Sequence, residues 1–197
     1  MSPILGIWAS QNYSRIAPSS YESISTVTLG STQTTISFSS IPQTYKHLQL
    51  RGIIRSTYVR AGSSTTPVAL YLRVGNSGTI YTSNYAWGEL YGTGTSALSA
   101  HYGGQNTMVV ADQTIPAANS SSQFYGPNVI DILDYQNTNK NKTLRALTGM
   151  DQNGSGSCNI ALFSSAYFGT QAITDLQFTT DSDFASGTTL ALYGIKG

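Results

Sequence analysis

From Ile24 onward the chain alternates apolar and polar residues, which is the pattern of a β-strand with one buried and one wet face. The segment 47–55 shows the pattern well. Its apolar positions, expected in the core, are Leu48, Leu50 and Ile54, and its polar positions, expected to face water, are His47, Gln49, Arg51 and Arg55.

Turn-forming residues divide the alternating chain into eight to ten expected strands. The first two form an expected hairpin around Gly30 and Ser31, with Val27, Leu29, Ile36 and Phe38 facing inward. The expected strands are residues 25–29, 34–38, 47–55, 68–74, 107–111, 128–135, 144–148, 160–164, 173–179 and 189–195.

The segment 129–151 places Asp131, Asp134 and three cations around a loop rich in amides. In a strand, Asp131 and Asp134 point to opposite faces, so they do not form a two-carboxylate catalytic or metal site. A helix would bring them together, but the turn formers at 136–141 and the alternating return leg favour a hairpin. Lys140, Lys142 and Arg145 are then expected to be solvated charges beside the loop, with contact to a partner at the loop tip as the alternative.

No window has an apolar stripe at helical spacing, and strong helix formers are scarce. The strand pattern therefore predicts an all-β fold, a two-sheet antiparallel β-sandwich or jelly roll, over residues 21–197. Residues 1–20 are expected to form a short N-terminal docking arm and linker.

Composition narrows the function classes. Charged residues make up 10% of the 197 residues, against about 25% in typical proteins, and the net charge is +1. We therefore expect neither nucleic acid nor membrane partners, and the weakly ionised surface favours a protein assembled into a larger structure. The single cysteine, Cys158, excludes an intrachain disulfide or a cysteine-rich zinc cluster, and we expect it to be a small buried apolar group.

The residue types of common active sites are sparse. His47 lies on a polar strand face, and His101 lies in an expected glycine-rich loop at 99–104. The loop at Asp151 resembles a calcium loop, but Ile160 stands where the bidentate glutamate should be, so a tight turn is favoured. We expect no catalytic, cofactor or metal site, and hence no enzyme.

Two sets of residues are candidates for binding. The arm carries an apolar group that either folds back as an edge strand of its own domain or docks on a neighbouring subunit or assembly. Its members are Ile4, Leu5, Ile7 and Trp8.

The second set is aromatic and lies among Gly, Asn, Ser and Thr at 76–104, a mixture typical of binding loops for protein or glycan. The alternative is that these rings fill the core and its rim. The candidates are Tyr81, Tyr85, Trp87, Tyr91 and Tyr102.

Several strings resemble a group of tailed-bacteriophage virion proteins that are frequent in cyanophages and other aquatic phages. The similarity covers nearly the whole chain and is weakest at 57–122. The strings are SPILGI at 2–7, SYESI at 20–24, TVTLG at 26–30, IPQTYKHLQLRG at 41–52, VIDILDYQNTNK at 129–140 and ALYGIKG at 191–197. The resemblance implies a non-enzymatic structural role in the virion, for a protein made in the host cytoplasm.

Two functions follow as expectations. The first is a component of the particle surface, a capsid decoration or a tail or appendage part, docked by its arm on other virion proteins and by self-association. By analogy with phage decoration and fibre proteins, a homotrimer is expected. The alternative is an adhesin at a tail fibre tip that binds host surface glycan or protein. A glycan depolymerase ranks last, because the nine acidic residues are scattered along the chain.

Overall fold

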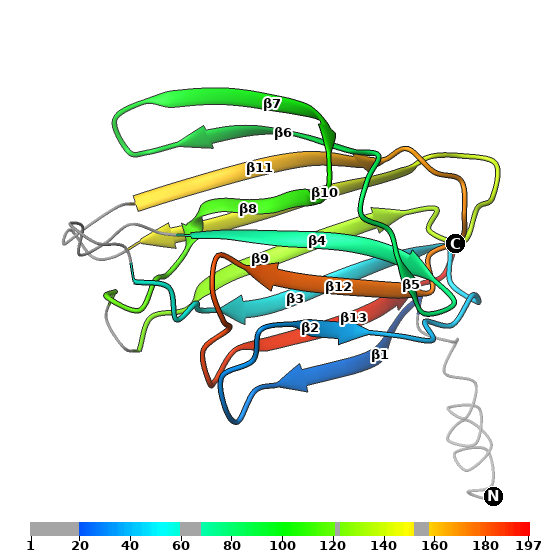
Figure 1. Ribbon diagram of the computed structural model, residues 1–197, viewed down its shortest axis with the longest axis horizontal. Helices are drawn as coiled ribbons and strands as arrows, with labels where there is room; N and C mark the ends of the chain where they lie inside the picture. Colours follow the sequence, from blue (N-terminus) through cyan, green and yellow to red (C-terminus); the bar gives the residue numbers. More distant parts are fainter. Residues whose placement is uncertain (1–19, 60–67, 121–122, 152–157) are drawn as a thin grey trace, which may run out of the picture.

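The computed structural model describes residues 20–59, 68–120, 123–151 and 158–197; the expected docking arm therefore lies outside the described residues. The described chain is all-β, with thirteen strands in two antiparallel sheets that form a β-sandwich (Figure 1). The predicted fold class is confirmed.

The two sheets differ in width. Across the larger, eight-stranded sheet the order is β1 (Tyr21–Thr28), β13 (Thr189–Ile195), β3 (His47–Ile54), β9 (Gly126–Leu133), β10 (Lys142–Asp151), β11 (Cys158–Tyr167), β6 (Tyr85–Gly92) and β7 (Ala97–Gln105). Across the smaller sheet it is β2 (Ile36–Phe38), β12 (Asp175–Thr180), β4 (Val68–Asn76) and β5 (Thr79–Ile80), with β8 (Met108–Ile115) also paired to β4.

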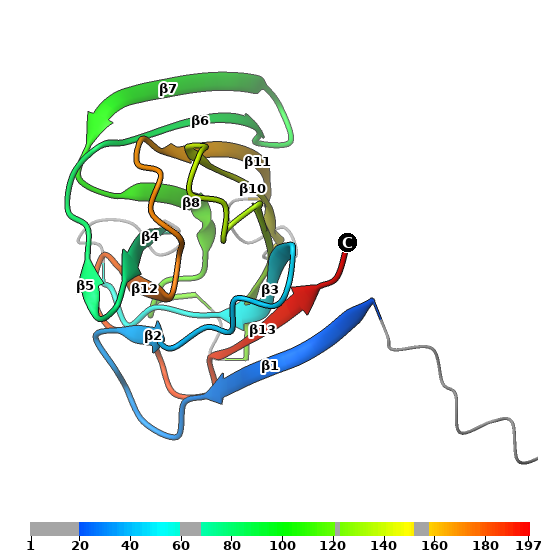
Figure 2. The same cartoon turned by 90° about the vertical axis from the view of Figure 1, so that its right-hand side faces the viewer.

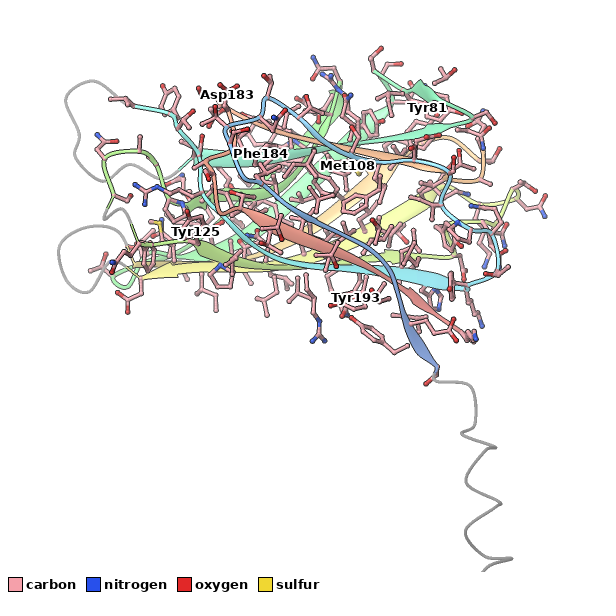
Figure 3. All side chains as sticks on the ribbon, turned by 90° about the horizontal axis from the view of Figure 1, so that it is seen from below. Tyr81, Met108, Tyr125, Asp183, Phe184 and Tyr193 are labelled. Carbon is pink, nitrogen blue, oxygen red and sulfur yellow. The ribbon has the colours of Figure 1, made fainter. Side chains whose placement is uncertain are left out.

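The large sheet curls around the small one, so that β6 and β7 lie over its β8 side (Figure 2). Buried apolar side chains from both sheets, such as Met108, fill the space between them together with Phe184 from the connection between β12 and β13 (Figure 3). Tyr193 lies on the opposite, outer side of the large sheet. The sandwich thus has one shared core and one wide outer face.

The expected hairpin of residues 25–38 is wrong, although both of its strands exist. β1 pairs with β13 in the large sheet, whereas β2 pairs with β12 in the small sheet. Leu29, Ile36 and Phe38 are buried as expected, and Val27 is partly buried. Alternation specifies which face of a strand is buried, but it does not specify the partner strand.

The second expected hairpin is confirmed. β9 and β10 pair antiparallel, and Arg145 stands directly opposite Asp131, with 2.9 Å between the guanidinium and the carboxylate. The alternation ends at Asp134, whose φ of 46° turns the chain, so that Tyr135 is buried instead of sharing the outer face with Leu133. Lys140 donates a hydrogen bond to Asp134 and lowers the pKa of that carboxyl group.

Three strands were not expected, β5, β6 and β7. They occupy much of the segment that was predicted to form binding loops, and His101 lies on β7 rather than in a loop. β7 is a poor match to the strand pattern, because both of its faces are largely exposed and the hydrophobic contrast between them is lost.

Lys142 is fully buried, so its prediction as a solvated charge is wrong. Its Nζ donates hydrogen bonds to the backbone carbonyls of Asn137, Lys140 and Thr170. The Asn137 and Lys140 carbonyls belong to the β9–β10 loop and the Thr170 carbonyl follows β11, so the ammonium group joins the two connections. Burial lowers the pKa of Lys142.

Arg55 was expected to face water and is instead buried. It follows β3, where the alternation stops, and its guanidinium donates to the carbonyls of Ala118, Ser120 and Phe124 at 2.8 to 3.1 Å. These carbonyls lie between β8 and β9, so Arg55 fixes that connection. Arginine suits this position because one planar group offers five donors.

Replacing Lys142 by methionine should lower the free energy of unfolding by about 2 kcal/mol, because the backbone carbonyls of Asn137, Lys140 and Thr170 lose their donor. Urea unfolding followed by circular dichroism measures the change. Lys140→Met is the matched control, since that side chain is 63% exposed and its ion pair with Asp134 should contribute little. Equal losses in the two variants would contradict the role given to Lys142.

Candidate interaction surface

The outer face of the large sheet carries a row of exposed leucines. Leu147 on β10 lies directly opposite Leu162 on β11, which lies directly opposite Leu90 on β6. Their side chains are 52%, 43% and 57% exposed, and Val129 on β9 continues the row. Side chains directly opposite on antiparallel strands touch, so the leucines form one patch and not isolated surface residues.

Next to this row, Ile160 on β11 projects from the sheet between two glycines. Gly149 on β10 and Gly92 on β6 are its direct cross-strand neighbours, and Ile160 is 62% exposed. Because neither glycine has a side chain, hollows lie to both sides of Ile160. The hollow toward Leu90 has a volume of about 300 Å³ and the one toward Pro127 about 500 Å³. We refer to Leu90, Leu147, Ile160, Leu162 and the two glycines as the Ile160 patch.

On the other side of the leucine row, polar side chains bind one another. Gln49 donates to Asp131 at 2.7 Å and accepts from Tyr21 at 2.6 Å and from Arg51 at 2.8 Å. Asp131 also accepts from Arg145. The outer face is therefore divided into a polar part with satisfied hydrogen bonds and an apolar part.

The five predicted aromatic residues are brought to one region, but they do not form one exposed surface. Tyr85 is fully buried, and its hydroxyl donates to the Tyr81 carbonyl at 2.9 Å. The Tyr81 ring stacks on the Tyr167 ring at 5.0 Å between centroids, and Tyr91 packs against the core. Tyr85 therefore fills the core, and Tyr81 and Tyr91 are partly buried at its rim.

Trp87 and Tyr102 remain accessible in part. Their ring centroids are 4.4 Å apart on the inner side of β6 and β7, and Tyr102 is 49% exposed. Trp87 also contacts the buried Phe163, with 6.4 Å between centroids. The small sheet ends at β8, so it does not cover Tyr102.

A carboxylate missed by sequence reasoning lies near this pair. Glu89 is half-buried on β6, and burial together with the charge of Asp112 on β8 raises the pKa of Glu89 to about 7. Burial also raises the pKa of Asp112. The two residues come from different sheets and are 23 positions apart, so no local sequence motif indicates that they lie close together.

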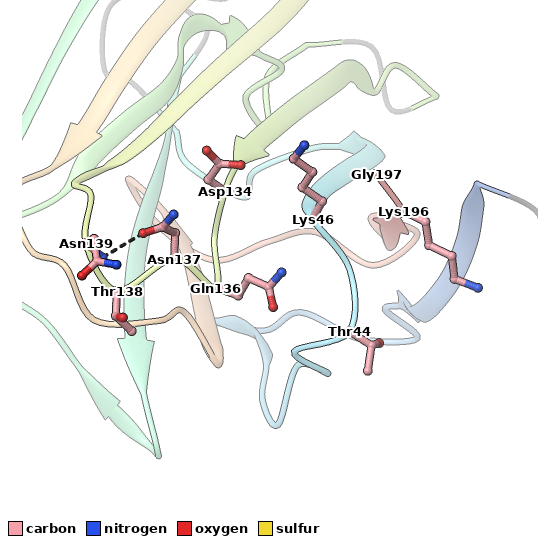
Figure 4. Close-up of a pocket in the computed structure, with 9 residues that line it drawn as sticks. All are labelled: Thr44, Lys46, Asp134, Gln136, Asn137, Thr138, Asn139, Lys196 and Gly197. Atoms are coloured by element: carbon pink, nitrogen blue, oxygen red, sulfur yellow. Dashed lines mark hydrogen bonds between the residues drawn. The ribbon is translucent and has the colours of Figure 1, made fainter.

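A polar pocket of about 720 Å³ lies at one end of the sandwich, beside the β9–β10 loop (Figure 4). Lys46, Lys196 and Asp134 line it with loop amides, and the Asn139 backbone donates to the Asn137 side chain at 2.8 Å. Lys196 is ion-paired with Glu22. The expected alternative of partner contact at this loop tip stays a prediction.

The described residues contain no group of three or more His, Cys, Asp or Glu side chains placed to hold a metal ion. No helix long and apolar enough to cross a membrane occurs in the same part of the chain. The glycine-rich loop after Asp151, the side chain of Cys158 and the arm residues Ile4, Leu5, Ile7 and Trp8 lie outside the described residues.

No protein-family model matches the chain, and no curated protein matches it significantly. The function is therefore inferred from the surfaces described above and from the sequence. The Ile160 patch was not predicted, because the binding candidates chosen from the sequence were aromatic, whereas the patch is aliphatic. The signal was present in the exposed alternate positions of β10, where Arg145 and Leu147 share the outer face.

The pKa of Glu89 predicts a pH dependence of stability. Folding raises this pKa from 4.5 to about 7, so the folded state binds the proton more tightly than the unfolded state. This contribution to stability is fully present below pH 4.5 and is lost as the pH rises to about 7. Thermal unfolding between pH 4 and 8 should show the decline, and Glu89→Gln should flatten it.

Glu22→Gln is the control for this measurement. The hydrogen bond from Lys196 lowers the pKa of Glu22, so the stability it contributes is present above pH 4.5 and is lost as the pH falls. Its replacement should leave the decline between pH 4.5 and 7 in place. An unchanged decline in Glu89→Gln would assign that decline to another group.

Proposed function

We propose that this protein is a non-enzymatic structural component of a bacteriophage particle, located at the virion surface as a capsid decoration or as part of the tail or an appendage. It is held there by its N-terminal arm, which docks on other virion proteins, and by association with further copies of itself. Synthesis takes place in the host cytoplasm.

The observation that carries the proposal is the row of leucines on the outer face of the large sheet. An antiparallel sheet with one face exposed to water normally presents polar side chains on that face. A contiguous apolar patch on a sheet face marks an interaction site. The low content of charged residues and the resemblance to virion proteins support a permanent assembly over a free protein.

A second function, an adhesin that recognises host surface glycan or protein, is favoured by the Trp87–Tyr102 pair. Tyr102 is half-exposed at the edge of the sandwich, and its ring is held by contact with Trp87. A rigid aromatic surface provides binding area at a low cost in conformational entropy. Tyr85 does not fit this role, because its side chain is fully buried.

Deleting residues 1–10 should abolish incorporation of the protein into particles, because the arm supplies the docking contacts. Mass spectrometry of purified particles measures incorporation and the number of copies: hundreds place the protein on the capsid, and a few tens or fewer place it on the tail. Circular dichroism of the shortened chain controls for folding. Normal incorporation of the shortened chain would refute docking by the arm.

Replacing Tyr102 by alanine separates the two functions. If the protein is an adhesin, particles carrying this variant should adsorb to host cells several-fold more slowly, since the exposed ring is lost. The structural role leaves the adsorption rate unchanged. Phe168→Ala is the matched control, because Phe168 is similarly exposed at 54% and follows β11 outside the ring pair of Trp87 and Tyr102.

A further inference from the structure

The Ile160 patch is shaped as a projection between two hollows. Ile160 rises from β11, and the hollows lie over Gly92 and Gly149 on the neighbouring strands. A single surface that has both a projection and hollows fits a second copy of itself when the copies are related by a two-fold axis.

The two glycines are not required by the backbone. Neither has a φ in the left-handed region, and a Cβ atom would meet only ordinary contacts, 3.7 Å from Ile160 Cγ2 at Gly92 and 3.6 Å from the Asn159 carbonyl at Gly149. Glycine within a strand weakens it, and it often marks a site of close approach by another chain. Here the missing side chains create the hollows.

We propose that the Ile160 patch is an interface with a second copy of this chain, in which Ile160 of each copy enters a glycine hollow of the other. This inference deepens the proposed self-association and rests on it. The proposed interface joins the copies in pairs. The expected homotrimer would instead require a head-to-tail interface, in which two different surfaces of the chain meet.

The charges on the outer face permit such pairing. Leu90, Leu147, Ile160 and Leu162 carry no charge, so the centres of two patches do not repel each other; the carboxylate of Asp151 lines the hollow toward Pro127 and belongs to the rim. The adjacent charges of Asp131 and Arg145 are already paired within each copy. An uncharged centre with a polar rim is the usual anatomy of a protein interface.

The size of the patch sets the expected affinity. With strands about 4.8 Å apart and about 3.3 Å per residue, the patch itself lies on three strands, β10, β11 and β6, and covers roughly 200 Å² for four residues of strand length. When the outer face of the flanking strands β9 and β7 is included, the contact reaches roughly 600 Å² for eight residues of strand length. Specific interfaces bury about 800 Å² per partner, so we expect a weak dimer with a micromolar dissociation constant. Many copies held on one particle would strengthen such a contact by avidity.

Sedimentation velocity of the full chain from about 1 to 500 µM tests the proposal, with the expected species at the mass of two chains. Ile160→Asp places a charge in the hollow, and Gly92→Val fills it; each should raise the dissociation constant at least tenfold. Phe168→Asp is the matched control, because Phe168 is exposed beyond the far end of β11. It should leave the dimer unchanged, and thermal unfolding checks that every variant is folded.

The remaining outcomes overturn the inference. They are a monomer at all concentrations, a trimer, or a dimer that survives both patch variants. The double variant Ile7→Ser, Trp8→Ser tests the other occupant: if it removes the dimer and Gly92→Val also removes it, the arm and not a second patch fills the hollows.

The two proposals fail separately. A patch-dependent dimer whose chain is missing from purified particles would remove the virion role and leave the interface. A chain present in particles but monomeric in solution would remove the interface and leave the virion role.

Discussion

The pairing register of β10 with β9 and β11 is the constraint on which the outer face depends. Side chains alternate between the two faces of a strand, so a slip of one residue would turn every outward side chain inward. In the observed register Leu144 and Ala146 face the core, and Arg145 and Leu147 face outward. The charge pair with Asp131 and the leucine contact with Leu162 are made in this register alone.

Two buried cations, Lys142 and Arg55, fix the connections at the ends of these strands. Lys142 begins β10 and binds carbonyls of the β9–β10 loop and of the connection that follows β11, while Arg55 binds the connection that leads into β9. A buried ammonium or guanidinium is stable only when its donors are satisfied, and here backbone carbonyls satisfy them. The few charged residues of this chain therefore serve partly to fix loops and not to keep the protein soluble.

The class of fold and ten of the strands could be predicted from the sequence, because the alternation of apolar and polar residues directly indicates which side chains of a strand are buried. The prediction failed where burial on one face is absent, as on β7, and where pairing is non-local, as for β1 with β13. Lys142 and Arg55 were placed in water because their acceptors are backbone carbonyls that no residue pattern reveals. Tyr85 was among the binding candidates because composition does not tell a buried ring from an exposed one.

The unequal widths of the sheets explain why two surfaces remain open to partners. A sheet of eight strands cannot be covered by the small sheet, so the inner side of β7 extends past β8 and exposes Tyr102. In the described chain, no further layer covers the outer face. Covering its polar part would not add stability, because the hydrogen bonds of that part are already made. The leucines and Ile160 gain by leaving water, since burial of apolar surface is the favourable term. The side chains that most require a partner are therefore aliphatic and lie on β10, β11 and β6, and this favours assembly over glycan recognition as the main role of the fold.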